Sequence, residues 1–193
     1  NQGGDPYDYT VWNADTDWQD EMFQTGFLTN NTVSITASGD RSKFYLGLGY
    51  VMEEGSIKSE KLNKFTVNLH SEHKVTDFLR FGFQVNGVRA LYPDAKGVGS
   101  ALKAAPIAPV YDAESGLLHT LPDFQRAQVW NPMIEPVLRG AHNKSANYRM
   151  AGNIYGELDL MKNLTFKATF SLDYASSQSR SYSPLIYVYN PDV

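Results

Sequence analysis

The sequence of 193 residues contains no cysteine, and this absence removes several kinds of chemistry. Disulfide cross-links, thiolate metal ligands and cysteine nucleophiles are all excluded. Positive charge is also scarce, because 17 lysines and arginines stand against 21 aspartates and glutamates, which gives a net charge of -4. The basic residues are scattered along the chain, so we do not expect nucleic acid as a partner.

Long hydrophobic runs are missing as well. No stretch approaches the roughly 20 apolar residues that a membrane-spanning helix needs. The chain opens on a polar segment rather than a signal peptide, so for an exported protein we expect a mature chain or a fragment. A mean hydropathy of -0.39 does not exclude a membrane β-barrel, because only alternate residues of a barrel strand face lipid.

What the sequence does contain is alternation of apolar and polar residues in six stretches. In one of them, Phe65, Val67 and Leu69 fall on one face, while Lys64 and Asn68 fall on the other. A β-strand turns successive side chains to opposite faces, so each stretch has one apolar and one polar side. We predict six strands, over Thr32–Ser38, Ser42–Val51, Asn63–His73, Asp77–Val88, Tyr148–Leu160 and Leu164–Tyr174.

The connections between these strands differ in length. Residues 39–41, 74–76 and 161–163 make tight turns, whereas 52–62 and 89–146 are long. In an up-and-down sheet, successive connections lie at alternate ends, so all the long ones gather at one end. A soluble β-sandwich also alternates, but short periplasmic turns opposite long outer loops are typical of outer-membrane barrels.

Aromatic residues on the apolar face form two groups around an aliphatic belt. One group lies toward the long loops and the other toward the tight turns, as Tyr50, Phe65, Tyr148 and Tyr174 and as Phe44, Phe81 and Phe166. Such girdles are typical of a lipid-facing wall. Six strands are too few to close a barrel, since the smallest have about eight, and open edges are not tolerated in lipid.

We therefore predict an all-β fold: an antiparallel up-and-down transmembrane β-barrel segment, about six strands of a larger barrel, with one long extracellular loop. Residues 1–30 are expected to form an extracellular loop leading into the barrel. Residues 31–193 supply the strands, with the long extracellular loop at 89–146. A plug domain and the remaining barrel are expected to lie outside this chain.

Several motifs resemble the early barrel of SusC/RagA-type TonB-dependent outer-membrane transporters. The first of them are Asp15–Phe23 (DTDWQDEMF), Asn31–Gly39 (NTVSITASG), Tyr45–Tyr50 (YLGLGY) and Glu54–Lys58 (EGSIK). The resemblance continues through Ala105–Asp112, Asn131–Pro132, Asn163–Phe166 and Tyr182–Pro184. It covers nearly the whole chain, and the combination of motifs is specific although each motif alone is weak.

The resemblance implies part of the barrel of a TonB-dependent importer of oligosaccharides or peptides in the bacterial outer membrane. The implied partners are a SusD-like surface lipoprotein that acts as a lid, the TonB–ExbB–ExbD system acting through the plug region, the oligosaccharide or peptide substrate, and outer-membrane lipid. No enzymatic activity and no cofactor are implied. Two alternatives stay open, a soluble carbohydrate-binding β-sandwich module and a passive or structural outer-membrane barrel.

The long loop holds our candidates for substrate binding. Aromatic rings offer stacking faces for sugar rings or peptide side chains, and neighbouring polar groups offer hydrogen bonds. The candidates are Tyr92, Tyr111, Asp123, Phe124, Gln125, Arg126 and Trp130. The alternative interpretation is that these residues pack the loop onto itself or onto the lid.

We assign no metal site and no catalytic residue. The acidic residues Asp15, Asp17, Asp20 and Glu21 are of the type that binds calcium, but no glycine stands where a tight cation loop would turn. No Gly-x-Ser-x-Gly elbow is present. Charged residues of the polar face are expected to pair across strands or to contact the plug. They are Lys64, Arg80, Arg149, Glu157, Asp159, Lys167 and Asp173.

Overall fold

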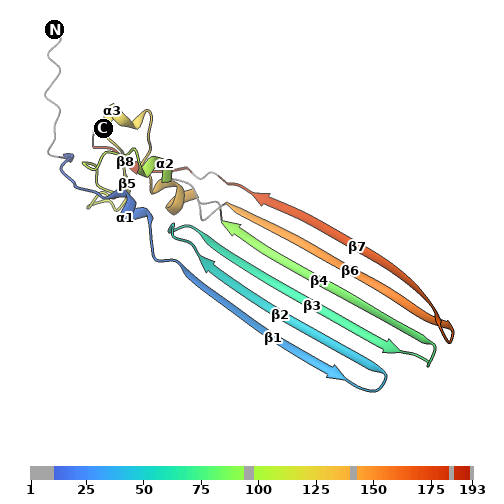
Figure 1. The fold of residues 1–193 in the computed structure, drawn as a ribbon. Coiled ribbons are helices and arrows are strands. Elements are labelled where there is room, and N and C mark those ends of the chain that lie inside the picture. The colour runs from blue at the N-terminus through green and yellow to red at the C-terminus, as the bar shows by residue number, and fades with distance from the viewer. Residues whose placement is uncertain (1–10, 94–97, 140–142, 183–184, 192–193) are drawn as a thin grey trace, which may run out of the picture.

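The computed structural model describes residues 11–93, 98–139, 143–182 and 185–191. It shows one long antiparallel sheet with a small lobe at one end (Figure 1). The sheet runs in the order β1-β2-β3-β4-β6-β7. Its strands are β1 (Phe27–Ser38), β2 (Ser42–Glu54), β3 (Lys61–Lys74), β4 (Leu79–Pro93), β6 (Lys144–Met161) and β7 (Leu164–Arg180). Within the described residues, no helix is long and apolar enough to cross a membrane.

All six predicted strands are present, and each runs further toward the lobe than alternation indicated. The extension is clearest in β7, which continues six residues past Tyr174 to Arg180. The added segment Ser176–Arg180 is polar on both faces, so it carries no period-2 signal. Backbone pairing with β6 continues regardless, because ladder hydrogen bonds do not depend on side-chain polarity.

The strand register collects the apolar side chains on one face. Directly paired residues on neighbouring strands point to the same side of a sheet. One row across all six strands consists of Ile35, Leu46, Leu69, Val85, Gly152 and Leu172. The adjacent polar row consists of Ser34, Gly47, Asn68, Asn86, Ala151 and Asp173. The sheet therefore has one apolar and one polar face, as predicted.

Both connections that the sequence predicts to be long, 52–62 and 89–146, are shorter in the structure, because the strands on either side extend into them. The turns over 39–41, 75–78 and 162–163 are short and lie at the end of the sheet away from the lobe. The connection expected over 52–62 is reduced to residues 55–60, because β2 and β3 extend into it. Only the connection between β4 and β6 is long, and its residues 98–139 belong to the lobe.

The lobe is built from three segments that are distant in the sequence. It contains α1 (Trp18–Met22), α2 (Val98–Ala101), β5 (Leu118–His119), α3 (Asp123–Arg126), the π-helical turn η2 (Ile134–Arg139) and β8 (Val188–Tyr189). Strands β5 and β8 pair in parallel. The buried apolar cluster of the structure lies here, and comprises Trp12, Trp18, Met22, Ala101, Ala108, Leu118, Leu121, Val129, Met133 and Ile134.

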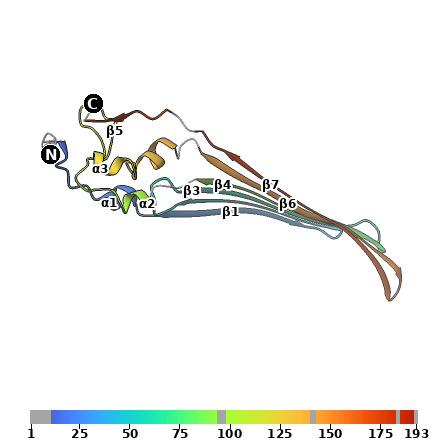
Figure 2. The same ribbon diagram turned by 90° about the horizontal axis from the view of Figure 1, so that it is seen from above.

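The apolar face of the sheet, by contrast, has no second layer over it in the described part of the chain (Figure 2). Phe81, Phe166 and Phe170 are 40%, 58% and 70% exposed. A β-sandwich would bury these rings in a core between two sheets. The described residues thus lack the packing that the soluble alternative requires.

Candidate functional site

Motifs that are far apart in the sequence meet in the lobe. Residues 14–18 run beside residues 105–108, and four backbone or side-chain donors of the first segment bond carbonyls of the second. The backbone N–H of Ala14 donates to Ile107 (3.1 Å). Thr16 donates from its backbone N–H to Pro106 (2.8 Å) and from its hydroxyl to Ala108 (2.8 Å). The Trp18 indole N–H donates to the carbonyl of Ala105 (2.9 Å). Several residues that carry the family resemblance therefore hold the lobe together.

Asn131 has a similar structural role at the other side of the lobe. Its amide donates to the carbonyls of Val110 (3.1 Å) and His119 (2.8 Å), and its oxygen accepts from the N–H of Met133 (2.9 Å). The residue is only 2% exposed. Without Asn131, the carbonyl of His119 and the N–H of Met133 would lose this partner in a dry interior, whereas the carbonyl of Val110 would keep the N–H of His119 (3.0 Å). This explains an asparagine in the Asn131–Pro132 motif.

His119 is buried and lies between two aromatic rings. Its ring centroid lies 5.0 Å from that of Trp12 and 5.2 Å from that of Tyr189. Nδ1 is 2.8 Å from the carbonyl oxygen of Thr120. Since a carbonyl only accepts, Nδ1 carries the proton in this arrangement. His119 thus packs the lobe core rather than binding a metal, and no group of three metal-ligating side chains occurs among the described residues.

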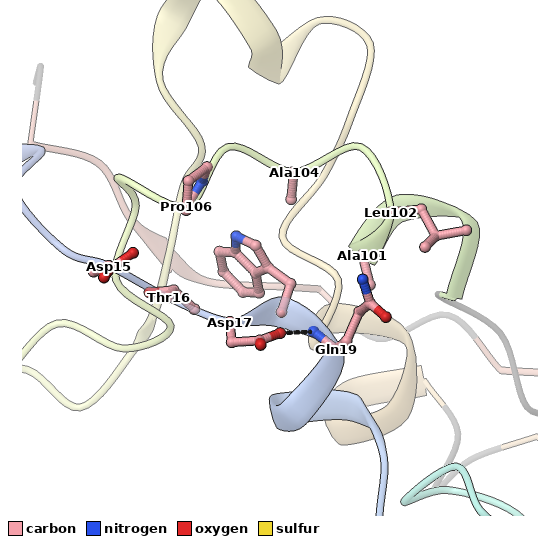
Figure 3. Close-up of a pocket in the computed structure, with 9 residues that line it drawn as sticks. Asp15, Thr16, Asp17, Gln19, Ala101, Leu102, Ala104 and Pro106 are labelled. Atoms are coloured by element: carbon pink, nitrogen blue, oxygen red, sulfur yellow. Dashed lines mark hydrogen bonds between the residues drawn. The ribbon is translucent and has the colours of Figure 1, made fainter.

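A pocket of about 470 Å³ opens between α1 and the chain around α2 (Figure 3). It is lined by Asp15, Thr16, Asp17, Trp18, Gln19, Ala101, Leu102, Ala104 and Pro106. The Asp17 carboxylate caps α1 by accepting from the N–H groups of Gln19 (2.9 Å) and Asp20 (3.2 Å). Sequence reasoning noticed the acidic residues but missed the pocket, because its second wall comes from residues more than 80 positions later.

The candidate residues for substrate binding are dispersed over the lobe. Tyr92 is the second-last residue of β4 and pairs with Ser145, and Tyr111 forms a bridge with Leu118. Asp123 and Phe124 begin α3, and the Phe124 ring is 66% exposed.

The two other candidates in α3 are Gln125 and Arg126. The Gln125 amide accepts from the N–H of Ala105 (2.8 Å) and donates to the carbonyl of Lys103. It therefore ties α3 to the chain after α2. Arg126 is part of α3, but its side chain lies outside the described residues, as do Ser183 and Pro184 of the last motif.

Trp130 is the candidate that lines a cavity. Its ring is 64% exposed, and the cavity of about 90 Å³ beside it is mostly apolar. Thr120, Leu121, Val129, Asn131, Ile134 and Val188 complete the lining. The hydroxyl of Thr120 is buried without a hydrogen-bond partner. Sequence could not reveal this grouping, because the parallel pairing of β5 with β8 brings Val188 to it.

Charged residues on the polar face of the sheet pair across strands, as expected. The Arg149 guanidinium lies 2.6 Å from the Asp173 carboxylate, and the Lys167 ammonium lies 2.8 Å from the Glu157 carboxylate. Arg80 bridges Glu157 (3.6 Å) and Asp159 (3.4 Å).

Tyr155 lies among these pairs and fixes the local packing. Its hydroxyl donates to the Glu72 carboxylate (3.2 Å), and its ring lies 4.5 Å from the Lys167 ammonium. The ring covers Gly82, where a Cβ would lie 2.6 Å from it. The polar face is thus an ordered, charge-paired surface.

Comparison with known proteins finds no matching family model. The chain is 26% identical over 189 residues to TonB-dependent receptor P3 of Formosa agariphila, and the match covers 91% of this chain and 18% of the receptor. It is 30% identical over 115 residues to TonB-dependent receptor SusC of Bacteroides thetaiotaomicron, covering 58% and 12% respectively. The chain therefore spans less than a fifth of the length of either relative.

Solved structures give the same likeness in fold. The RagAB peptide transporter matches with a TM-score of 0.69 at 18% identity, covering 86% of this chain and 20% of the solved one. The RagAB peptide importer in its 'open-open' state matches with a TM-score of 0.71 at 18% identity, covering 97% and 22%.

Proposed function

We propose, taking this chain as a segment of a SusC/RagA-type TonB-dependent transporter, that it forms part of the wall of an outer-membrane importer. The resemblance found in the motifs is confirmed in sequence and in fold. Import itself belongs to the complete receptor, in which this wall contributes a lipid-facing surface, a polar lumen surface and an outer lobe.

One observation carries this proposal: an apolar face that crosses all six strands, has no covering layer among the described residues and ends in aromatic residues on both sides. Tyr50, Phe65 and Tyr148 share one row with Arg89 near the lobe, and Phe166 shares a row with Leu158 and Leu79 near the turns. Ten residues of β4 separate the two rows, from Arg89 to Leu79. At about 3.4 Å per residue and a tilt of about 40°, the band is about 26 Å tall, close to the apolar band of roughly 25 Å on membrane barrels.

The lobe lies at the end of the sheet where the long connection emerges, so we place it and the segment leading into β1 outside the cell. The polar face then lines the lumen, where a plug domain would contact the charge pairs. The edge strands β1 and β7 pair with strands beyond this chain, because open edges are not tolerated in lipid. A SusD-like lipoprotein covering the lobe and a TonB–ExbB–ExbD system acting through the plug are the partners that the relatives suggest.

Oligosaccharides and peptides both stay in the proposal. Peptides are the cargo of the solved neighbour RagAB, and exposed aromatic rings such as those of Tyr111, Phe124 and Trp130 suit either substrate. These rings and the neighbouring polar groups are proposed as the contact surface for the substrate or the lid.

Protease accessibility on intact cells tests this placement. In the complete receptor, a cleavage site inserted after Glu114 in the lobe should be cut by external protease. The same site inserted after Asp40 in a tight turn should be cut only once the outer membrane is permeabilised. Cleavage at Asp40 on intact cells would overturn the orientation. Uptake that persists without TonB would overturn energised import in favour of a passive barrel.

A single variant tests the contact surface. Trp130→Ala removes an exposed ring beside a cavity, and we expect uptake of the substrate to fall at least several-fold, since aromatic anchors commonly dominate such contacts. Tyr187→Ala is the matched control, because Tyr187 is a similarly exposed lobe ring at 73%. Co-purification of the lid separates loss of substrate contact from loss of lid contact. Unchanged uptake at normal surface abundance would remove Trp130 from the surface.

A further inference from the structure

The apolar face of the sheet carries a groove midway along three of its strands. The groove has a volume of about 180 Å³ and lies over β4, β6 and β7. Its apolar lining consists of Val85, Met150, Gly152, Ile154, Phe170 and Leu172. These three strands are consecutive in the sheet, with β6 paired to β4 on one side and to β7 on the other. The groove is thus formed by this chain alone.

Gly152 produces the groove. It stands directly between Val85 and Leu172 in one row of the sheet, and it leaves a gap in that row because it has no side chain. A Cβ at Gly152 would lie 2.8 Å from the carbonyl oxygen of Gln84 and 3.4 Å from a methyl of Val85. Close backbone approach therefore excludes any larger residue, and the gap is built into the packing of β4 against β6.

Arg89 lies on the same apolar face, above the groove. It pairs with Phe65 on one side and Tyr148 on the other. Its Cζ lies 5.7 Å from the Tyr148 ring centroid, and its Nε lies 3.4 Å from the Tyr148 hydroxyl. Among the described residues, no carboxylate forms an ion pair with Arg89. This exposed arginine on the largely apolar face thus keeps guanidinium donors available.

The spacing between Arg89 and the groove matches one leaflet of a membrane. On this face Met150 follows Tyr148, and Ile154 lies six residues beyond Tyr148. Six residues at about 3.4 Å, tilted by about 40°, descend about 16 Å. Half of a hydrocarbon core of roughly 30 Å is about 15 Å. The groove therefore runs from the aromatic girdle to the middle of the membrane.

We propose that the groove and Arg89 form a binding site for one phosphate-bearing membrane lipid. An acyl chain lies along Gly152 between Val85 and Leu172, and the lipid phosphate accepts hydrogen bonds from the Arg89 guanidinium. Arginine suits this role because its planar donors match phosphate oxygens and its side chain reaches the interface. This site rests on the proposed membrane placement of the sheet, and it is separate from substrate import.

Native mass spectrometry of the complete receptor in nonionic detergent tests the site, with phosphatidylglycerol and the phosphate-free lipid diacylglycerol, of matched acyl chains, as probes. We expect one phosphatidylglycerol to bind about tenfold more tightly than diacylglycerol, since only the phospholipid can form a charge-assisted bond with the Arg89 guanidinium. Arg89→Gln should abolish the preference, and Arg89→Lys should keep most of it.

Two further variants address the groove. Val85→Phe fills it and should weaken both lipids alike, whereas Val33→Phe is the matched control on the same face of β1 and should change neither. Equal binding of the two lipids to the unaltered receptor would overturn the proposal, as would equal losses in Val33→Phe and Val85→Phe, which indicate only a general lipid shell. Retention of a second receptor copy in place of lipid would also overturn it.

Failure of this site and failure of the proposed function give different results. A receptor that reaches the outer membrane and prefers phosphatidylglycerol but shows no TonB-dependent uptake would refute import and leave the lipid site standing. TonB-dependent uptake without the lipid preference would support import and refute the lipid site. Arg89→Gln decides whether the lipid site exists even if Val85→Phe fails to assemble, because Arg89 is exposed and its side-chain contacts in the described part of the chain are with Tyr148 alone.

Discussion

Asn131 illustrates what single residues do in this chain. Its amide satisfies two carbonyls and one N–H in a buried place, just as Trp18 satisfies the carbonyl of Ala105. Sequence motifs pointed to these positions but not to their roles, because each partner lies in a different segment. The same limit applies to Gln125, which looked like a free hydrogen-bonding group in the sequence but bonds the backbone around residues 103–105.

Replacing Asn131 by alanine should loosen the lobe. The variant removes the Asn131 partner of the His119 carbonyl and of the Met133 N–H, which costs about 1–3 kcal/mol. Hydrogen exchange of the Met133 amide should accelerate by about tenfold or more. Gln178→Ala, at an exposed position in β7, serves as the control. An unchanged exchange rate at Met133 would show that water replaces the amide.

Asp112 should make the turn after it sensitive to acid. Its carboxylate accepts from the Ser115 hydroxyl (2.6 Å) and N–H (2.7 Å), and the Ser115 hydroxyl bond is the main cause of a pKa below the ordinary 3.8. Because the folded pKa is lowered, the stabilisation is complete above pH 3.8 and disappears as the pH falls through the lowered value. Proteolysis after Glu114 by an acid-active protease should therefore rise in that range.

The Asp112→Asn variant gives the control for this acid effect. An amide at this position does not titrate, so the turn of the variant should be cleaved with little dependence on pH in the same range. Identical pH profiles for the two proteins would assign the acid sensitivity to another group.

At the level of elements, alternation located every large strand, because a strand with one apolar and one polar face has apolar and polar residues in alternate positions. It failed at the strand ends near the lobe, where Ser176–Arg180 are polar on both faces. It also missed α1, α3, β5 and β8, which have two to five residues each. Elements this short leave no periodic signal, and their positions are set by contacts with distant segments.

An arginine substitution should change stability much more on the apolar face than on the polar face. Leu69 lies in a continuous apolar row between the two aromatic girdles, and Leu69→Arg should destabilise the membrane-inserted receptor by about 2–4 kcal/mol. Asn68→Arg, its neighbour on the polar face, should change stability by less than about 1 kcal/mol. Urea unfolding in lipid vesicles measures both. Equal effects would mean that the apolar face does not contact lipid.

At the scale of the whole molecule, the number of strands alone predicted that the barrel wall is incomplete. Nothing in the sequence predicted the lobe. Its core combines residues 11–23, 98–139 and 185–191, and no local pattern relates these segments. The lobe is also joined to the connection after β2. Phe23 and Ile57 form an antiparallel bridge between hydrogen bonds from Gln24 to Ser56 and from Lys58 to Met22.

The absence of cysteine makes this junction directly testable. Phe23 and Ile57 form a non-hydrogen-bonded pair, for which Cα atoms lie about 4.5 Å apart, within the range a disulfide spans. We expect the double variant F23C/I57C to form a disulfide in the complete receptor without reductant, seen as a shift in gel mobility. The pair F23C/I35C, whose positions lie on different parts of the structure, should stay reduced. Failure of the first pair to cross-link would contradict the junction.

The number of strands has a further consequence for how the lobe can form. Six crossings are an even number, so the chain enters β1 and leaves β7 on the same side of the membrane. Only this parity lets residues 11–23 and 185–191 meet the segment 98–139. Loss of one strand would leave the two flanking segments on opposite sides, and the lobe could not close. A closed lobe therefore indicates that every strand of this segment has crossed the membrane.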